Sequence, residues 1–247
     1  MTNFANVRSK IPEFQRWFNE FKAHADVDFG WYPYETVGGL NRIAPIIPET
    51  IDHLFDGNRD IADIGAADGV MSFFLETLGN RCDIYDYAPT NFNQLKGAHY
   101  IKERTNSKVN IYSVDLDSQF RLEKKYDLVF LLGIFYHLKN PYYVLEFLAQ
   151  RTRYLCFSTR ITRTPYAGGP DISSLPLAYL LAPTECNNDA TNYWLFTETG
   201  LKRIFDRAGW SVISFQLIGD TENSNPQNDE HREEAWAVLE SKVMEKE

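Results

Sequence analysis

The sequence has few cysteines and no long apolar run. Its three cysteines are odd in number and widely spaced, so we expect reduced core residues that form neither a disulfide nor a metal site: Cys82, Cys156 and Cys186. The longest apolar runs are too short to cross a bilayer, and the first residues lack the basic-then-apolar pattern of a signal peptide. These absences predict a cytoplasmic protein that does not span a membrane.

Basic residues are also in short supply. The chain has 25 Lys and Arg against 34 Asp and Glu, which gives a net charge of −9 and a pI near 5.1. Nucleic-acid binding normally needs a basic surface that neutralises phosphates. No run of Lys or Arg here is longer than two. The charge balance therefore disfavours a nucleic-acid partner and favours small-molecule chemistry.

What is present is a globular composition, with 44% hydrophobic residues in 247. This size suits an N-terminal helical and aromatic extension, residues 1–55, followed by one α/β domain, residues 56–247. A helix is expected over 11–24, with Pro12 in its first turn. The region 162–196 shows no periodicity, and a loop of that length is usually functional or disordered.

Strand and helix patterns alternate from residue 60 onward, which predicts a parallel sheet. The expected strands are 60–65, 82–86, 109–114, 126–133, 153–161, 210–215 and 235–239. The expected helices are about 69–79, 91–104, 141–150 and 198–208.

The turn after the first of these strands predicts a cofactor site. It reads Asp63-x-Gly65-x-Ala67-x-Gly69, and small residues there let a ligand approach a helix start with its positive dipole. Asp86 follows about 20 residues later and can accept hydrogen bonds from both hydroxyls of a ribose. The pattern favours an adenosine-containing cofactor, and a strand-turn-helix without a ligand is the alternative.

The turn does not match the dinucleotide fingerprint. That fingerprint needs a small residue at its sixth position so that helix and strand pack closely. Val70 stands there and is bulky and β-branched. An NAD-linked dehydrogenase is therefore disfavoured.

Two segments carry a family resemblance. The alternating small residues resemble motif I of the class I S-adenosylmethionine (SAM) methyltransferases, with Ala67 in place of the middle glycine. The segment DLVFLLGIFYHLKNP, residues 127–141, is similar to the segment after strand four in the enzymes that carboxymethylate the tRNA wobble uridine. The likeness covers roughly residues 40–240. It implies a Rossmann-like, seven-stranded, mostly parallel sheet whose last strand is antiparallel, flanked by helices.

One departure from that branch affects the predicted cofactor. The tRNA enzymes use carboxy-SAM and hold its extra carboxylate partly with a lysine in their N-terminal region, whereas residues 26–41 here contain no Lys or Arg. A buried carboxylate without a cation is costly. We therefore expect ordinary SAM and methyl transfer to O or N of a small or medium-sized acceptor. The alternatives are a tRNA-modifying (carboxy)methyltransferase and a catalytically silent SAM-binding domain.

The resemblance also implies which residues bind the cofactor. They are Asp63 at the amino end of SAM, Gly65, Ala67 and Gly69 in the turn, Asp86 at the ribose, Tyr87, Ala88, Asp115 and Leu116 around the adenine, and Leu132, Gly133 and Tyr136 near the sulfonium. Three have plainer alternatives: Asp63 caps its own turn, Asp115 is a solvated strand-end acid, and Tyr136 is core packing.

His137 is the candidate general base, next to Tyr136, because imidazole titrates near neutrality. Methyl transfer from a sulfonium is an in-line displacement for which positioning can suffice. The favoured reading of His137 is therefore a structural histidine bonded to a backbone carbonyl at a strand–helix junction.

Substrate-binding candidates lie in two places. Arg160 and Arg163 were expected after the fifth strand, either on an anionic substrate or as solvent-facing loop charges. A polar and aromatic cluster suits a hydroxylated or ring substrate, although such residues also make turns: Glu185, Asn187, Asn188, Asp189, Asn192, Tyr193 and Trp194. The aromatic group Trp31, Tyr32 and Tyr34 forms either a lid wall over the cofactor or a satellite core.

Overall fold

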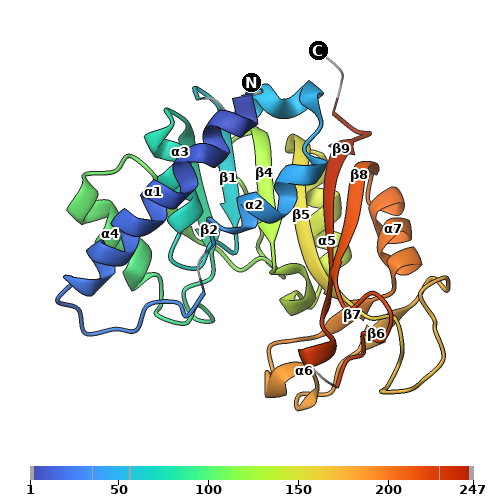
Figure 1. Cartoon of the computed structure of the whole chain (residues 1–247). Coiled ribbons are helices and arrows are strands. Elements are labelled where there is room, and N and C mark those ends of the chain that lie inside the picture. The colour runs from blue at the N-terminus through green and yellow to red at the C-terminus, as the bar shows by residue number, and fades with distance from the viewer. Residues whose placement is uncertain (1–2, 35, 56, 228, 245–247) are drawn as a thin grey trace. The chain divides into compact units, whose positions relative to one another are not determined.

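The computed structural model describes residues 3–34, 36–55, 57–227 and 229–244, without the side chains of residues 3 and 229. The chain divides into two compact units, residues 1–130 and 131–247 (Figure 1). The boundary expected between residues 55 and 56 falls inside the first unit and stays a prediction.

The first unit contains the start of the parallel sheet. Its strands β1 (Asp60–Ile64), β2 (Arg81–Asp86), β3 (Asn110–Ser113) and β4 (Tyr126–Leu132) take the order β3-β2-β1-β4, and β1, β2 and β3 pair in parallel. The helices α3 (Val70–Thr77) and α4 (Lys96–Thr105) link them. Ile61, Ala62 and Ile64 are all fully buried, as expected for a strand covered on both faces.

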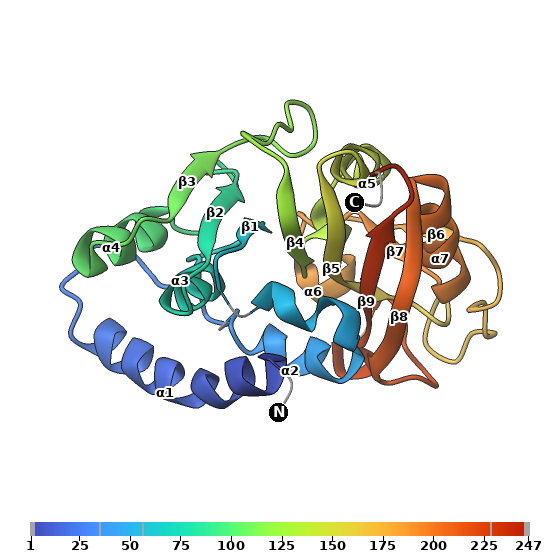
Figure 2. The same ribbon diagram turned by 90° about the horizontal axis from the view of Figure 1, so that it is seen from above.

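The N-terminal helix α1 (Asn3–Ala23) starts earlier than predicted, and Pro12 lies inside it rather than in its first turn. Its buried side chains recur at helical spacing: Phe4, Val7, Ile11, Phe14 and Phe18. Phe14 packs against Phe74 of α3 at a ring distance of 5.1 Å, and Phe21 packs against Tyr100 of α4 at 5.7 Å. This continuous apolar face outweighs the cost of an internal proline, so α1 lies alongside α3 and α4 (Figure 2).

Short helices join α1 to β1. They are α2 (Gly39–Ile43) and the 3₁₀ helices η1 (Ala44–Ile46) and η2 (Glu49–Phe55). Phe55 of η2 packs edge-on against Phe4 of α1 at 4.6 Å and against Phe130 of β4 at 6.1 Å, which ties the extension to the sheet of the first unit.

The second unit holds the antiparallel part of the fold. Strand β9 (Glu233–Ser241) pairs antiparallel with both β5 (Thr152–Ile161) and β8 (Trp210–Gly219). The helices are α5 (Pro141–Ala149), α7 (Glu198–Arg207) and the 3₁₀ helices η3 (Phe135–His137) and η4 (Asp229–His231). The Thr197 hydroxyl caps α7 by accepting a bond from the Gly200 N–H.

The region 162–196 is not the unstructured loop that its composition indicated. Strands β6 (Ala178–Leu180) and β7 (Trp194–Phe196) form an antiparallel hairpin, and the short α6 (Glu185–Asn188) lies between them. Leu181, Cys186 and Leu195 are buried together, with Tyr136 and Tyr179 packed on them. This small core orders the region, and its apolar positions are too few to show a period in the sequence.

The predicted fold class is confirmed. The chain has a mixed α/β, Rossmann-like fold with a mostly parallel sheet, antiparallel last strands and an N-terminal helix. The seven expected strands are β1 to β5, β8 and β9, and β6 and β7 are additional. The three cysteines are buried and form no disulfide. No helix within the described ranges has the length and apolar character needed to cross a membrane.

Candidate functional site

The turn after β1 adopts a left-handed backbone at three positions. Gly65, Ala67 and Gly69 have φ angles of 71°, 57° and 72°, where glycine is favoured and other residues are uncommon. Gly69 also meets a packing demand, because a Cβ there would lie 2.2 Å from Ile84 Cδ1 on β2. Small residues at alternate positions are what this backbone requires.

Asp86 closes β2 and reaches back to that turn. It is 8% exposed. Its Oδ2 accepts hydrogen bonds from the Ala67 N–H and from Asn91 Nδ2, both at 3.0 Å, and its Oδ1 accepts one from the Tyr87 N–H at 2.7 Å. Burial raises the pKa of the Asp86 carboxyl, although these bonds oppose the shift.

The bonds of Asp86 limit what else it can hold. A carboxylate offers about four acceptor positions, so three donors from the chain leave about one, on Oδ1. The sequence assigned both ribose hydroxyls to Asp86. In this arrangement Asp86 has an acceptor position for one ribose hydroxyl. A second hydroxyl would require one of the three chain donors to move. Asp86 therefore fastens the turn to β2 as well as being the candidate ribose acid.

Asp63 lies within β1 and is 4% exposed. Its Oδ2 accepts a hydrogen bond from Ser72 Oγ on α3 at 3.1 Å. The turn does not use it, because the N–H groups of Gly65 and Ala67 bond Tyr85 O and Asp86. Burial, aided by the charge of Asp86, raises the pKa of Asp63 to about 7. A cationic partner would favour its ionised form.

A hollow of about 150 Å³ lies beyond the ends of β2 and β3. It is lined by Tyr87, Ser113, Val114, Asp115, Gln119 and Arg121. Asp115 caps the turn that follows, accepting from the Asp117 N–H at 2.9 Å and from Ser118 Oγ at 2.6 Å. These bonds match the strand-end alternative, and an adenine contact of Asp115 stays a prediction.

The other two residues predicted near the adenine flank this hollow. The Ala88 N–H donates to Ser113 Oγ at 3.1 Å, and Leu116 is buried. Gln119 and Arg121 were missed, because nothing in the pattern distinguishes them from other polar residues after a strand.

Three buried polar residues beside the turn were also missed: Asp68, Asn91 and Asn93. Asp68 Oδ2 accepts from the Tyr32 N–H at 2.8 Å, and its Oδ1 accepts from Asn93 Nδ2 at 2.7 Å. Asn93 Nδ2 also donates to Gly30 O at 3.1 Å. The repeated asparagines ahead of the α4 pattern were the available signal, since Asn there often serves the backbone.

The three aromatic residues before the sheet have different surroundings, and they are Trp31, Tyr32 and Tyr34. Trp31 packs edge-on against Phe18 and Phe29 and belongs to a satellite core. Tyr32 lies beside the cofactor turn, and its hydroxyl accepts the Phe92 N–H at 2.9 Å. Burial raises the pKa of Tyr32, and the nearby charge of Asp86 adds to the shift. Tyr34 is 66% exposed.

In the second unit, β4 ends at Leu132 and Gly133 follows it. Leu132 is half-buried. Gly133 has a φ of 69°, and its N–H lies 3.1 Å from Ser158 O and 3.0 Å from Ser158 Oγ. A Cβ at Gly133 would meet no atom within 4 Å. The backbone requires glycine here, and the position faces open space.

Tyr136 and His137 are adjacent in η3 and differ in role. Tyr136 packs on the small core of the insertion, as its plainer alternative expected. His137 Nδ1 lies 3.2 Å from Thr191 O and 2.9 Å from Thr191 Oγ1. Burial lowers the pKa of His137, although the nearby Asp189 opposes the shift. These contacts match the structural alternative for His137. They involve Nδ1 and not the other ring nitrogen, Nε2.

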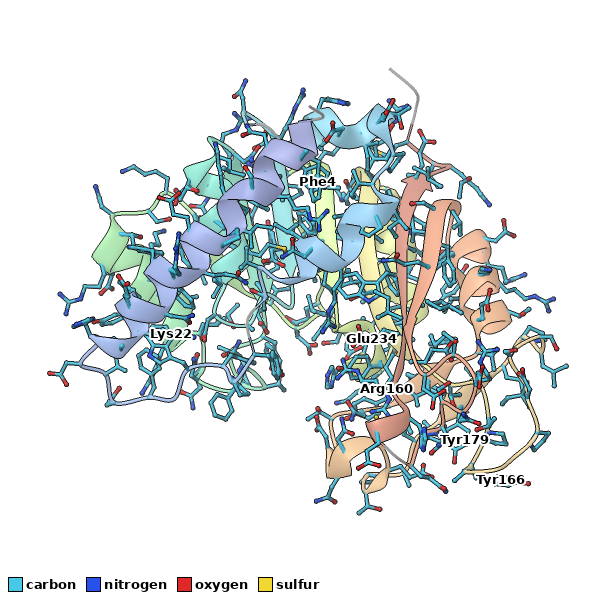
Figure 3. All side chains as sticks on the ribbon, viewed as in Figure 1. Phe4, Lys22, Arg160, Tyr166, Tyr179 and Glu234 are labelled. Atoms are coloured by element: carbon cyan, nitrogen blue, oxygen red, sulfur yellow. The ribbon has the colours of Figure 1, made fainter. Side chains whose placement is uncertain are left out.

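The expectation of solvent-facing arginines after β5 is wrong. Arg160 lies within β5, is 2% exposed, and donates to Asn187 Oδ1 at 3.2 Å. Glu234 on β9 is its register partner (Figure 3). Arg163 donates to the fully buried Glu233 at 2.9 Å. Both arginines therefore bond within the chain, Arg160 with Asn187 and Asn225 and Arg163 with the acid Glu233 on β9.

The polar cluster of the insertion is also used partly by the chain. Glu185 accepts from Tyr179 OH at 3.0 Å and from the Ala182 N–H at 2.8 Å. Asn192 is buried and donates to Cys186 O at 2.8 Å. These bonds match the turn-making alternative.

The remaining cluster residues have varied surroundings. Asn187 takes the bond from Arg160, and Asp189 accepts from the Thr191 hydroxyl at 2.6 Å. Asn188 is exposed, while Tyr193 and Trp194 are half-buried. A substrate role for these three stays a prediction. In the part of the chain that the structure describes, no three His, Cys, Asp or Glu side chains group as a metal site would require.

Comparisons with known proteins agree with this geometry. A family model described as a methyltransferase domain matches residues 32–215. No curated protein sequence matches the chain. A similar fold occurs in the N-terminal domain of EvdMO1, solved in the presence of S-adenosylhomocysteine (SAH) and D-fucose. It is 15% identical, with a TM-score of 0.58, over 93% of this chain and 96% of that one.

Two further solved structures share the fold. The 1,6-didemethyltoxoflavin-N1-methyltransferase of Burkholderia thailandensis is 14% identical, with a TM-score of 0.52, over 77% of this chain and 74% of that one. Coclaurine N-methyltransferase is 13% identical, with a TM-score of 0.54, over 75% and 68%. At such identities the likeness shows the fold alone.

The cofactor of this family fits the first unit. Buried Asp63 suits an ammonium group, the remaining acceptor position of Asp86 suits a sugar hydroxyl, and the hollow beside Tyr87 suits a base. The chain belongs to the methyltransferase domain family, and it is a class I methyltransferase that uses S-adenosyl-L-methionine.

Proposed function

We propose that the chain transfers a methyl group from SAM to an oxygen or nitrogen of a small or medium-sized acceptor. The observation that carries this proposal is the pair of buried carboxyls, Asp63 and Asp86, on either side of one left-handed turn. Asp86 also fastens the turn to β2, but Asp63 is buried against one hydroxyl, that of Ser72, and a cationic nucleoside would use both acids.

Each residue of the first unit has a specific task in this proposal. Bound SAM supplies an electrophilic methyl group on a sulfonium. Asp63, once ionised, pairs with the ammonium of the methionine part. Asp86 Oδ1 accepts from one ribose hydroxyl, and Tyr87 and Asp115 flank the adenine. Fixed carboxylates of this kind orient a ligand without reorganisation during the reaction.

The second unit contributes positioning. In that unit the backbone at Gly133 is open, because a Cβ there would meet no atom within 4 Å, and Leu132, Gly133 and Tyr136 remain the residues that the family resemblance assigns to the sulfonium. Since burial keeps His137 neutral and its Nδ1 is held by Thr191, we assign it the task of fixing η3 rather than removing a proton. A displacement at a sulfonium methyl needs alignment and exclusion of water more than a base.

Ordinary SAM and a non-nucleic-acid acceptor are part of the proposal. The segment 26–41, which includes Tyr32 beside the turn, offers no Lys or Arg for an additional carboxylate. The net charge of −9 opposes binding to tRNA. One similar structure was solved with D-fucose, and two similar methyltransferases are named for coclaurine and 1,6-didemethyltoxoflavin, which supports a small-molecule acceptor.

Calorimetric titration with SAH tests the site, with two variants on the same strand. Asp86→Asn should weaken SAH binding by about 1–3 kcal/mol, because it removes a charge-assisted acceptor and loosens the turn at Ala67. Asp83→Asn is the matched control. Asp83 is also buried on β2, but it bonds Tyr126 and Asn110 away from the turn. Its SAH affinity should equal that of the parent chain.

Two results would contradict the assignment. Absence of SAH binding at millimolar ligand would remove the proposed function. Equal losses in both variants would show that any altered acid on β2 disturbs binding, and Asp86 would then lose its ribose role.

A further inference from the structure

A second hollow lies entirely within the second unit. Its volume is about 410 Å³, within the range of roughly 300–1,000 Å³ typical of small-molecule sites. We call it the Trp194 hollow, and its lining is mostly apolar: Lys139, Asn140, Pro141, Tyr142, Tyr143, Ala178, Trp194 and Phe196. It is separate from the hollow beside Asp115, which lies in the first unit.

One wall of the Trp194 hollow is a face of the β6–β7 hairpin. The register pairs Ala178 with Phe196 and Leu180 with Trp194. Residues directly opposite each other in an antiparallel pair share a face, so these four side chains form one apolar surface. Leu180 is 62% exposed and extends that surface beyond the hollow.

The other wall is the first turn of α5, where Tyr142 and Tyr143 are each 38% exposed. The polar groups of Tyr142 and Trp194 already make hydrogen bonds within the chain. Tyr142 OH donates to Arg207 O at 3.0 Å, and Trp194 Nε1 donates to Lys139 O at 3.4 Å. The rings are therefore fixed in place, and their apolar surface remains in contact with water. A planar ring that covered this surface would bury apolar area without the entropic cost of ordering the two walls.

Charge narrows the choice of ligand. Among the described residues that line the Trp194 hollow, Lys139 alone carries a charge. Its Nζ lies 5.6 Å from the ring centre of the half-buried Tyr193 and makes no ion pair with a described residue. The nearest acid on this wall is Glu146, which accepts a bond from Tyr142 OH at 3.3 Å. The single ammonium of Lys139 favours an anionic ring over a cationic one through its charge.

We propose that the Trp194 hollow binds the methyl acceptor, and that the acceptor is a planar aromatic molecule carrying an anionic group. That the bound molecule is the methyl acceptor rests on the proposed function, whereas its binding in the hollow requires no cofactor. The position along the chain supports the role, because Lys139 follows Tyr136 and His137 by two to three residues in the loop after β4.

Nuclear magnetic resonance with 2-naphthoate tests this on the full chain without cofactor. The chain has five tryptophans, and Trp194→Phe identifies the indole N–H signal of Trp194. That signal should shift saturably, with a dissociation constant on the order of 1 mM or tighter for a probe of this size. Trp194→Ala and Tyr142→Ala should each weaken binding by about ten-fold or more.

The charge is tested with 2-naphthamide, a neutral probe of the same shape. The parent chain should prefer 2-naphthoate by about three- to ten-fold, and Lys139→Gln should abolish the preference. Tyr166→Ala is the aromatic control, since Tyr166 is 52% exposed in the same unit but does not line the hollow. Lys125→Gln is the charge control. Neither should change binding.

Three results would overturn the proposal: no saturable shift of the Trp194 signal, binding that Trp194→Ala leaves intact, or a concentration-dependent dimer that Trp194→Ala dissociates. The last would mean that a second copy covers the hollow. SAH titration on the same samples separates the two proposals. SAH binding without 2-naphthoate binding would contradict only the acceptor site. Absence of SAH binding would contradict the proposed function.

Discussion

At the scale of single residues, Gly69 and Gly133 share a conformation and differ in surroundings. Both have φ near 70°, at 72° and 69°. A Cβ at Gly69 would overlap Ile84, whereas a Cβ at Gly133 would meet nothing. The pair therefore separates backbone strain from steric overlap within one protein.

Gly69→Ala should destabilise the fold more than Gly133→Ala. Backbone strain alone costs about 1 kcal/mol at Gly133, and the clash at Gly69 adds roughly 1–3 kcal/mol. Urea unfolding of the two variants measures the difference. Equal losses would show that Ile84 moves aside at little cost.

Asp63 makes stability depend on pH. Burial raises its pKa to about 7, above its ordinary value of 3.8. The folded chain therefore keeps a proton that the unfolded chain has lost. Its contribution to stability is fully present below about pH 4 and is lost as the pH rises through about 7.

Asp63→Asn should remove this contribution to the pH dependence, because a neutral amide mimics the protonated acid. We expect the variant to match the parent chain at about pH 4 and to exceed its free energy of unfolding at pH 8. Urea midpoints at both values measure this, with Asp117→Asn as a control that keeps the parent slope. An unchanged decline in Asp63→Asn would show that another group titrates.

At the scale of elements, Asp68 fastens the segment before α2 to the cofactor turn. Its carboxylate holds the Tyr32 N–H on one oxygen and Asn93 on the other, and Asn93 holds Gly30. Tyr32 then bonds the Phe92 N–H. Three hydrogen bonds thus connect residues 30–32 to the loops that follow β1 and β2, and a fourth joins those two loops to each other.

Asp68→Ala should release this segment while α3 and β2 stay folded. Hydrogen exchange at the Tyr32 amide should accelerate by about ten-fold or more, and SAH affinity should fall because Tyr32 no longer borders the turn. Asp28→Ala is the control from the same segment, since Asp28 is 87% exposed. Faster exchange with unchanged SAH affinity would separate the segment from the cofactor.

The elements themselves were largely predictable. The strand bounds agree within one residue from β1 to β5, and three of these strands have an Asp or Gly at their end: Gly65 after β1, Asp86 in β2 and Gly133 after β4. The start of α1 was missed because Pro12 was given its usual first-turn place. Helix α4 begins later than expected, since Asn91 and Asn93 serve the turn instead of the helix.

At the scale of the whole molecule, residues close in sequence were predicted well and partners far apart were not. The candidate cofactor acids Asp63 and Asp86 lie on neighbouring strands, so a local pattern placed them. The partner of Arg163 is 70 residues away, and only the register of β9 against β5 makes that contact. Sequence spacing holds no information about such a register, and for this reason Arg160 and Arg163 were expected on an anionic substrate or in solvent and not bonded within the chain.

The same register has a consequence for how the second unit is assembled. Strand β9 fills the gap between β5 and β8, and the ribosome makes it after both of them. Until it emerges, each of those strands presents an open hydrogen-bonding edge to other nascent chains. The sheet then closes through contacts of large sequence separation, which form slowly. This topology therefore exposes incomplete copies of the chain to aggregation with one another during synthesis.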